Sequence, residues 1–538
     1  MRNRKLALVA ILCSLLFAAS MVPLLDEEPS SATGQIVITD SAGFKTTLPG
    51  PAPHVVTMGY AFSLTVYELG GSAKVVGYDK YSTYDYQKDD RMKAYDGVKN
   101  LGSGYSSEIE SLYTGMSQLV DAGEFDKGTD VIIFNNYSST IKEGGFRDIL
   151  VGYGYKVVCL GASDYDGSLE VVRTISEIIG IDPEGLVDKM VDAKAKVVKR
   201  VGEFGVYVKP KAMYVTGSGD DVKAYNSGIA VSMMEICGAE NVGYNAPTPT
   251  SYVMSVSGII QKNPDLIFLD GNYKGTAEEF KDKYGIPAKY KVYKMGRDWN
   301  NYCPGIADGL DAMFAELHAF EITDSAGFKT KLIGPAPRVV TMGYAFSLTV
   351  YELGGSAKVV GYDKYSTYNY QKDERMNAYD GVKNLGSGYS SEIDSLYTGM
   401  SQLVDAGKFD KKTDVIIFNN YSGTIKEGGF RDVLVGYGYK VVCLGASDYD
   451  GSVEVVRTIS KVIGLDPEGL VDKMVDAKRD TAGKVKALGD RNKPKAMYVT
   501  ASGDDVKAYN SGIAVSMMEV CGAENVGYIS SAQTYSVR

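Results

Sequence analysis

Histidine, tryptophan and positive charge are all scarce in this sequence of 538 residues. It has two histidines, His54 and His318, a single tryptophan, Trp299, and a formal net charge of -10. Nucleic-acid binding normally needs a basic patch or stripe, so this acidic chain is not expected to bind DNA or RNA. Neither histidine lies in a loop where chemistry would take place, and no nucleophile has a base at a plausible spacing. The sequence therefore predicts no enzymatic activity and no cofactor.

Cysteine is also sparse, with six residues in the chain. Cys159 and Cys237 lie in apolar runs, a pattern typical of buried free thiols. No pair of cysteines has the spacing of a metal knuckle. The sequence therefore predicts buried thiols and no structural metal.

The first 35 residues have the pattern of an export segment. A basic start at residues 1–5 precedes an apolar run at residues 6–25, and an acidic stretch follows at residues 26–28. By the positive-inside bias, this order places the rest of the chain outside the cytoplasm, in the periplasm or at the cell surface. A run of about 20 residues fits both a cleaved signal peptide and a retained membrane anchor, so both remain open.

The largest feature of the sequence is internal: residues 37–244 return almost unchanged as residues 321–528, at a constant offset of 284. This period far exceeds the roughly 20 to 50 residues of solenoid repeats, so it predicts tandem duplication of a whole domain. Copy one, residues 36–319, continues well past the repeated part. Copy two, residues 320–538, stops soon after the counterpart of Tyr252 and lacks the last quarter of the module.

Within each copy, short β-branched runs alternate with helical patterns, which is typical of α/β folds with parallel sheets. The predicted strands of copy one fall at 55–57, 75–77, 131–134 and 157–159, and then at 212–215, 266–269 and 292–295. Between the two sets, an apolar stripe at spacings of three and four residues predicts one long helix at about 183–205. We therefore expect two Rossmann-like lobes, at about 36–168 and 209–319, joined by this helix, and a second, incomplete module.

A glycine-rich string at residues 216–219 invites comparison with phosphate-binding loops. It lacks the Lys-Ser/Thr pair that ends such a loop in nucleotide-binding proteins. We expect an ordinary turn from a strand into a helix.

Five stretches of copy one resemble the helix-linked, class III substrate-binding proteins of ABC importers for iron siderophores, haem and cobalamin. The resemblance runs through residues 36–319, in the order of the family around the long helix. The stretches are ITDSAGFKTTLPGPAPHVVTMGYAFSLTVYELGGSAKVVGYDKY, NLGSGYSSEIESL, MMEICGAENVG, IIQKNPDLIFLD and RDWNNYCPGIADGLDAMFAEL. The resemblance implies two rigid lobes that close little around a ligand in the cleft, a permease docked on the cleft side, and no catalysis.

Tyrosine is abundant, at 40 residues, and aromatic walls suit a large planar or chelated ligand. In doubly wound sheets the ligand lies beyond the carboxyl ends of the strands. That rule nominates Tyr60, Asp79, Tyr81, Tyr105, Asn136, Tyr137 and Asp164 in the first lobe, and Gly217, Tyr225, Tyr252, Asn272, Tyr273, Arg297 and Trp299 in the second. The zinc and manganese receptors of related architecture use several imidazole ligands, and two histidines do not meet that need.

Members of this family use a glutamate on each lobe to dock onto permease arginines. Glu108 matches the first-lobe position and returns in copy two as Glu392. The helix dipole alone also favours a carboxylate at a helix N-terminus. In the second lobe the matching position is Ser257, so the sequence departs there from two-point docking.

Two other functions fit the same residues. Duplicated binding lobes on an anchor could act as a surface sensor or scaffold, and phenolates and carboxylates such as Tyr137 and Asp164 could bind ferric ion directly. Whatever the function, the shortened second lobe of copy two buries too little surface to offset the conformational entropy that its chain loses on folding. We expect one ligand site per chain, in copy one.

Overall fold

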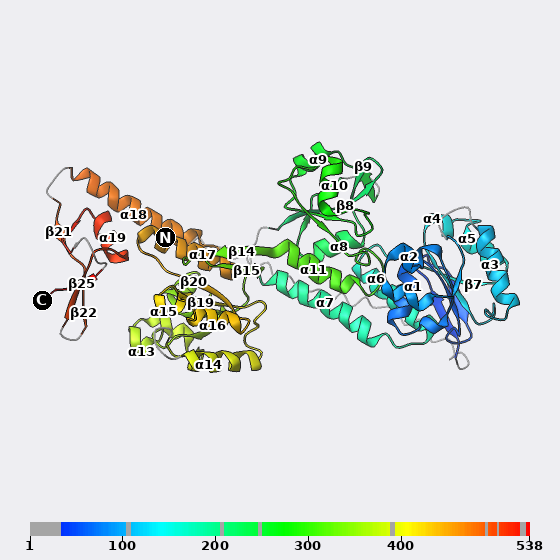
Figure 1. Ribbon diagram of the computed structural model, residues 1–538, viewed down its shortest axis with the longest axis horizontal. Helices are drawn as coiled ribbons and strands as arrows, with labels where there is room; N and C mark the ends of the chain where they lie inside the picture. Colours follow the sequence, from blue (N-terminus) through cyan, green and yellow to red (C-terminus); the bar gives the residue numbers. More distant parts are fainter. Residues whose placement is uncertain are drawn as a thin grey trace, which may run out of the picture.

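The computed structural model describes residues 34–103, 109–204, 209–245, 250–387, 393–489, 493–502, 505–527 and 534–537 (Figure 1). The predicted export segment, Tyr105, Glu108 and Glu392 lie outside these residues. In the part of the chain that the structure describes, no helix has both the length and the apolarity to cross a membrane. The two copies follow one another along the long axis of the molecule, copy one from blue to green and copy two from yellow to red (Figure 1).

The first lobe of copy one is a parallel five-stranded sheet with apolar cores on both faces, preceded by an antiparallel hairpin. Strands covered on both faces need near-continuous apolar sequence, which the valine and isoleucine runs supply. The hairpin is β1 (Ile36–Thr39) and β2 (Lys45–Leu48), and the sheet order is β5 (Lys99–Asn100), β4 (Val75–Tyr78), β3 (Val55–Met58), β6 (Val131–Asn135) and β7 (Lys156–Leu160). The helices are α1 (Tyr60–Glu68), α2 (Tyr84–Gln87), α3 (Ile109–Asp121), α4 (Ser138–Ile141), α5 (Phe146–Gly152) and α6 (Tyr165–Ile179). The predicted strands of this lobe are confirmed.

Helix α6 illustrates how local sequence sets an element boundary. Asp164 caps its N-terminus by accepting a hydrogen bond from the amide of Gly167 at 2.7 Å. Gly180 ends it in the left-handed region, with φ at +66°, where a Cβ would lie 2.5 Å from the Cβ of Pro51. Only glycine meets both demands, so the helix ends where the chain enters the linker.

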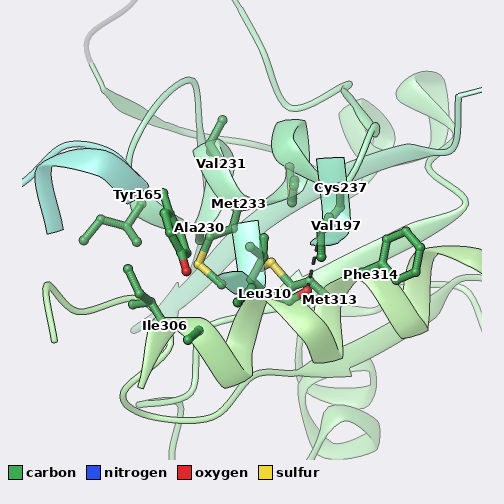
Figure 2. Packing of buried hydrophobic residues seen from close by; sticks show 14 of the residues in the cluster. Tyr165, Val197, Ala230, Val231, Met233, Cys237, Ile306, Leu310, Met313 and Phe314 are labelled. Carbon is green, nitrogen blue, oxygen red and sulfur yellow. Dashed lines mark hydrogen bonds between the residues drawn. The ribbon is translucent and has the colours of Figure 1, made fainter. Parts of the chain in front are cut away.

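The lobes are joined by one long helix, α7 (Glu184–Gly202), as the apolar stripe predicts. It packs lengthwise against α11 (Ile306–His318) and α8 (Ile229–Ile236) of the second lobe, and Met190 and Val197 are almost completely buried there. In Figure 2 the side chains of Leu310 and Met313 on α11 lie among those of Met233, Cys237 and Val197. Linker helix and second lobe therefore share one apolar core.

The second lobe has a mixed sheet, where the sequence predicted a purely parallel one. Strands β10 and β12 pair in parallel with β8, and β13 pairs in parallel with β12. In contrast, β9 runs antiparallel to β8, and β11 runs antiparallel to β9. The strands are β8 (Lys211–Ser218), β9 (Asp221–Tyr225), β10 (Glu240–Asn241), β11 (Ser251–Val253), β12 (Leu266–Leu269) and β13 (Lys291–Lys294), and the remaining helices are α9 (Val256–Lys262) and α10 (Ala277–Tyr284).

The expected strand-to-helix turn at residues 216–219 is wrong, because this string lies in a β-hairpin between β8 and β9. Polar and apolar residues alternate along β9, with Val222 and Ala224 buried, and that period of two belongs to a strand. Gly219, with φ at +60°, makes the turn.

Copy two repeats the hairpin, first lobe and linker of copy one, beginning directly after α11. Its strands are β14 (Ala319–Thr323), β15 (Lys329–Ile333), β16 (Val339–Met342), β17 (Val359–Tyr362), β18 (Lys383–Asn384), β19 (Val415–Asn419) and β20 (Lys440–Leu444). Its helices are α12 (Tyr344–Glu352), α13 (Tyr368–Gln371), α14 (Ile393–Asp405), α15 (Ser422–Ile425), α16 (Phe430–Gly436), α17 (Tyr449–Ile463) and the linker α18 (Glu468–Ala487). The first lobe of copy two thus has a complete parallel sheet.

After α18, the described residues of copy two form two small sheets and one helix. These are β21 (Lys495–Ala496) with β24 (Glu524–Asn525), the antiparallel set β22 (Val499–Ser502), β23 (Asp505–Tyr509) and β25 (Thr534–Val537), and α19 (Ile513–Val520). Arg538, the last residue given, corresponds to Met254 of copy one, which precedes β12, β13 and α11.

Candidate functional site

The strands of the first-lobe sheet are parallel, so their carboxyl ends meet at one edge. Chain order reverses between β3 and β6, which marks the switch point where open α/β sheets bind ligands. Tyr60 opens α1 after β3, and Asn136 follows β6. The amide of Asn136 lies over Gly161, where a Cβ would come within 2.0 Å of its Oδ1. Two predicted site residues therefore lie at this switch point.

Exposed aromatic side chains lie at the same edge of the sheet. The rings of Tyr81 and Tyr86 pack edge to face with centroids 4.9 Å apart, and Tyr86 is 54% exposed. Tyr137 is 44% exposed, and its amide donates a hydrogen bond to the side chain of Asn135 at 3.1 Å. Tyr81 and Tyr86 therefore form an aromatic pair after β4, and Tyr137 adds an exposed ring after β6.

The two predicted acidic residues of this lobe already serve the fold. Asp79 is fully buried and accepts a hydrogen bond from the hydroxyl of Ser82, and burial raises the pKa of its carboxyl to about 6. It presents no surface to a ligand, contrary to the expectation from its place after β4. Asp164 is exposed, but one of its carboxylate oxygens caps α6.

In the second lobe a hydrogen-bonded network lies at the carboxyl edge of the parallel strands. Tyr214 on β8 donates to the carboxylate of Asp270 after β12, and Asn300 donates to the hydroxyl oxygen of Tyr214 at 2.7 Å. The side-chain oxygen of Asn300 accepts from the amide of Ala230 at 3.1 Å, and the amide of Asn272 donates to Asp270 at 2.8 Å. Burial raises the pKa of Tyr214 far above its usual value, so its phenol stays protonated. The network fixes this edge rigidly.

Three predicted residues are engaged inside the second lobe. Gly217 lies against the ring of Tyr284, whose hydroxyl would be 2.8 Å from a Cβ at this position. Tyr273 packs edge to face on Phe280 at 5.2 Å between centroids. Tyr252 donates its hydroxyl hydrogen to a backbone carbonyl at 2.8 Å. These contacts give the three residues a role in the packing of the lobe.

Tyr225 and Trp299 lie half-buried close to the network. The ring of Tyr225 is 4.9 Å from that of Tyr214, between centroids, and its hydroxyl is 3.4 Å from that of Thr216. The indole of Trp299 stacks nearly parallel to Tyr293, with centroids 6.3 Å apart. Both aromatic residues support the carboxyl edge from within.

Two arginines connect the loops of the two lobes. Arg297 in the second lobe donates to the backbone carbonyls of Tyr86, at 3.2 Å, and of Gln87 in the first lobe. Arg91 in the first lobe donates to the carboxylate of Asp298 in the second at 3.1 Å. Of the predicted residues, Arg297 is thus brought against the loop that carries Tyr81.

Arg91 is the centre of a half-buried charge cluster. Besides Asp298, its guanidinium contacts Glu68 at 2.5 Å and Asp89 at 2.8 Å, so one cation serves three carboxylates. Tyr60 donates its phenolic hydrogen to Asp89 at 2.6 Å. Burial opposes ionisation of Asp89, yet hydrogen bonds from Arg91 and Tyr60 lower its pKa. Burial and the Asp89 contact raise the pKa of Tyr60, which therefore acts as a donor and not as a phenolate.

The sequence did not point to Arg91, Asp298 or Asn300. Arg91 and Asp298 are 207 residues apart, and no periodicity links positions so distant. The repeat gives half of the signal, since Arg91 returns as Arg375, but Asp298 lies beyond the repeated residues 37–244. Asn300 follows Trp299 in a loop. No sequence pattern there shows whether an asparagine side chain contacts a ligand or forms hydrogen bonds within the fold.

In the described ranges, no group of three or more His, Cys, Asp or Glu side chains is arranged to hold a metal ion. His54 pairs with Asp130 at 3.1 Å. His318 is buried, and this burial lowers its pKa to about 4. Cys159 and Cys237 are buried free thiols, as predicted.

No family model matches this chain, and no curated protein matches it. Among solved structures, the chain is similar to Helicobacter pylori CeuE in a Ni-His complex, with 16% identity, a TM-score of 0.43, and coverage of 53% of this chain and 88% of that one. It is also similar to the periplasmic haem-binding protein RhuT from Roseiflexus, with 13% identity, a TM-score of 0.38, and coverage of 49% and 97%. An ABC-type Fe3+-hydroxamate transport system from Saccharomonospora viridis gives 19% identity, a TM-score of 0.39, and coverage of 52% and 97%. At these TM-scores and identities, none of them identifies a ligand for this chain.

Proposed function

We propose that copy one is the substrate-binding component of an ABC importer, which captures an iron chelate, either a siderophore or haem, or cobalamin outside the cytoplasm. The observation that carries the proposal is the meeting of the two carboxyl edges. Loops from both edges are joined by Arg91 with Asp298 and by Arg297 with Gln87, while a single helix forms the covalent connection. Ligands of α/β lobes bind at such edges.

The rigidity of the linker also supports this function. Along α7, Lys189 pairs with Asp308 of α11 at 2.9 Å, and Lys196 pairs with Asp311 at 3.2 Å. Both pairs flank the shared apolar core of linker and second lobe. A lobe fixed in this way suits a protein that closes little around its ligand, in keeping with the family that the sequence resembles.

The tyrosines at the carboxyl edge of the first lobe support the proposed ligand class. Tyr81, Tyr86 and Tyr137 offer ring faces and hydroxyl groups, which match a large ligand with both apolar and polar parts. Asp79 is no longer a candidate contact because it is buried. The proposed contacts are therefore these tyrosines, Asn136 and Arg297, together with Asn272, which is exposed on the second lobe.

Delivery to a membrane permease is the remaining part of the proposal. Glu108 is the candidate docking residue of the first lobe, with Glu392 as its copy-two counterpart. In the second lobe, Ser257 is exposed near the start of α9, where its hydroxyl lies 2.9 Å from that of Ser255. A serine cannot form an ion pair with a permease arginine, so we propose docking that depends on the first lobe.

Native mass spectrometry of the exported chain mixed with ferric siderophores, haem and cobalamin tests this function. The expected result is one retained ligand of one of these classes per chain. Retention of ferric ion alone, with a phenolate-to-iron absorption band, would establish direct iron binding instead. Retention of none of the four would favour the sensor or scaffold function and contradict capture for import.

A further inference from the structure

The two copies meet where the linker helix of copy one ends on the first hairpin of copy two. Strand β14 begins at the residue directly after α11, so the two modules are joined without a spacer. Arg200, near the end of α7, donates hydrogen bonds to the backbone carbonyls of Ile333 at 3.0 Å and Pro335 at 3.2 Å. Arg200 is only 8% exposed, and Glu203 lies 3.2 Å from its guanidinium. Carbonyl and carboxylate oxygens therefore replace water around this cation.

Apolar contacts join the same two elements. Phe204, which follows the end of α7, is 2% exposed and lies against Gly334 of copy two, where a Cβ would come 2.5 Å from the ring. The ring also packs on Phe314 and His318 of α11, with centroids 5.8 and 4.8 Å apart. Ile333 packs against the core that α7 and the second lobe share. A side chain of copy two is therefore part of the apolar core of copy one.

Identical residues after the hairpin are covered in copy two and uncovered in copy one. The sequence Gly-Pro-Ala-Pro begins at Gly50 in copy one and at Gly334 in copy two. Pro335 is buried, whereas its counterpart Pro51 is exposed. Because the four residues are the same, the difference in burial comes from the linker end of copy one that packs on copy two.

Several sequence differences between the copies lie on the face of copy two that meets copy one. Copy two has Phe320, Ile333, Lys461 and Leu465 where copy one has Ile36, Pro49, Glu177 and Ile181. Phe320, Lys461 and Leu465 line, together with Phe204, a groove of about 620 Å3 at the junction. The ammonium group of Lys461 lies 5.2 Å from the ring centroid of Phe320, a cation–π contact that the isoleucine and glutamate of copy one could not make. The side chains of copy two therefore differ from those of copy one at places where the modules meet.

From these contacts we infer that the first lobe of copy two is a brace for copy one: its hairpin docks on the ends of α7 and α11, stabilises the second lobe and holds both modules in one fixed orientation. In Figure 1, β14 and β15 lie between the end of α11 and the first lobe of copy two. Domains joined only by the chain are expected to move relative to one another, whereas an apolar interface with buried hydrogen bonds resists such motion. This role of copy two needs no ligand of its own and does not depend on the ligand of copy one.

The first test measures the distance between the modules in the full chain by double electron–electron resonance. Spin labels are attached at Glu278→Cys on α10 and at Lys408→Cys in copy two, both of them exposed positions. Cys13→Ser and Cys521→Ser remove the other thiols that could react, because the remaining cysteines are buried. One narrow distance distribution is expected.

Variants on both sides of the interface test its contacts. Arg200→Ala removes the hydrogen bonds to the hairpin and should broaden the distance distribution at least about twofold. Ile333→Ser should also broaden it and leaves α7 unchanged. Lys484→Ala is the matched control, since Lys484 is the exposed counterpart of Arg200 at the end of α18, and it should have no effect. A broad distribution in the unmodified chain, or one that neither Arg200→Ala nor Ile333→Ser broadens, would overturn the inference.

A second measurement tests the stabilisation of copy one. Trp299 is the only tryptophan of the chain and lies half-buried in the second lobe, so its emission reports the unfolding of that lobe. Ile333→Ser should lower the midpoint of thermal unfolding seen by Trp299 by about 2 to 4 °C, and Lys484→Ala should leave it unchanged. A midpoint that Ile333→Ser does not lower would contradict the bracing of the second lobe by copy two.

Discussion

The same four residues, Ala-Met-Tyr-Val, are all buried at the start of one second lobe, whereas the last three of them are exposed at the start of the other. In copy one, Met213 and Val215 are completely buried within the eight-residue strand β8, which pairs with β12. In copy two their counterparts Met497 and Val499 are 45% and 43% exposed, and the strand breaks between β21 and β22. The four residues are the same in both copies, so their strand propensity is the same. The difference in burial comes from β12, the strand that pairs with β8 in copy one.

A substitution between the copies follows the same logic. Gly217 of copy one lies against Tyr284, and its counterpart in copy two is Ala501. Tyr284 lies beyond the repeated residues 37–244, and no described residue of copy two corresponds to it. The first lobes differ far less, because their own strands and helices complete both sheets.

The largest expected effect concerns His318, which ends α11, beyond the repeated residues 37–244. Burial lowers its pKa from 6.5 to about 4, so the neutral form stabilises the fold above pH 6.5. This stability should be lost as the pH falls from 6.5 towards 4, by about 3 kcal/mol in total. Denaturant unfolding of the wild type and of His318→Phe from pH 7 to pH 4 measures it. An equal loss in both proteins would contradict the assignment.

The next expected effect concerns a buried aspartate in each copy, and its dependence on pH is opposite to that of His318. Burial raises the pKa of Asp79, and of its counterpart Asp363, from 3.8 to about 6. The protonated form stabilises the fold below pH 3.8, and this contribution is lost as the pH rises through 6. Asp79→Asn should therefore raise stability at pH 8, by less than about 3 kcal/mol, and leave it unchanged at pH 4.

Asp363→Asn provides the internal comparison for this prediction. The two carboxyls have the same serine contact, so the substitutions should act alike wherever the two first lobes unfold as independent units. The free energy of unfolding of both variants, measured from pH 4 to pH 8, gives the change in stability that each substitution causes. A gain at pH 8 from neither substitution would show that these carboxylates are accommodated without cost.

A smaller effect separates the two copies through their arginines. Arg91→Met leaves three half-buried carboxylates without their shared cation and should destabilise copy one by about 2 kcal/mol. Arg375→Met removes an exposed contact to two carboxylates and should cost less. Thermal unfolding of both variants orders the two losses. The reverse order would contradict the cross-lobe role of Arg91.

These comparisons indicate what the sequence alone could predict. Valine and isoleucine runs predicted strands such as β6 and β12, because a buried strand leaves a continuous apolar signature. The hairpin after β8 was missed, since a glycine-rich string fits a turn into either a strand or a helix. At the site, loop position predicted Tyr81 and Arg297, but burial of Asp79 depends on contacts made by the whole first lobe. Pairing of Arg91 with Asp298 depends on how two lobes meet, which no local pattern records.

The smallest expected effect is on ligand binding. Tyr137→Ala removes an exposed ring at the proposed site and should weaken binding about tenfold, or 1.4 kcal/mol. Tyr421→Ala removes the equivalent ring of copy two, which is 55% exposed, and should have no effect. Calorimetric titration of both variants distinguishes the copies. Equal losses in both would mean that copy two contributes to binding.

Calorimetric titration of the full chain with the siderophore, haem or corrinoid that mass spectrometry identifies measures how many ligand sites the chain has. One site per chain is expected, with the same affinity after deletion of residues 320–538, because β12, β13 and the loop that carries Arg297 and Asp298 belong to copy one. Two equivalent sites in the full chain, or loss of binding on that deletion, would contradict it.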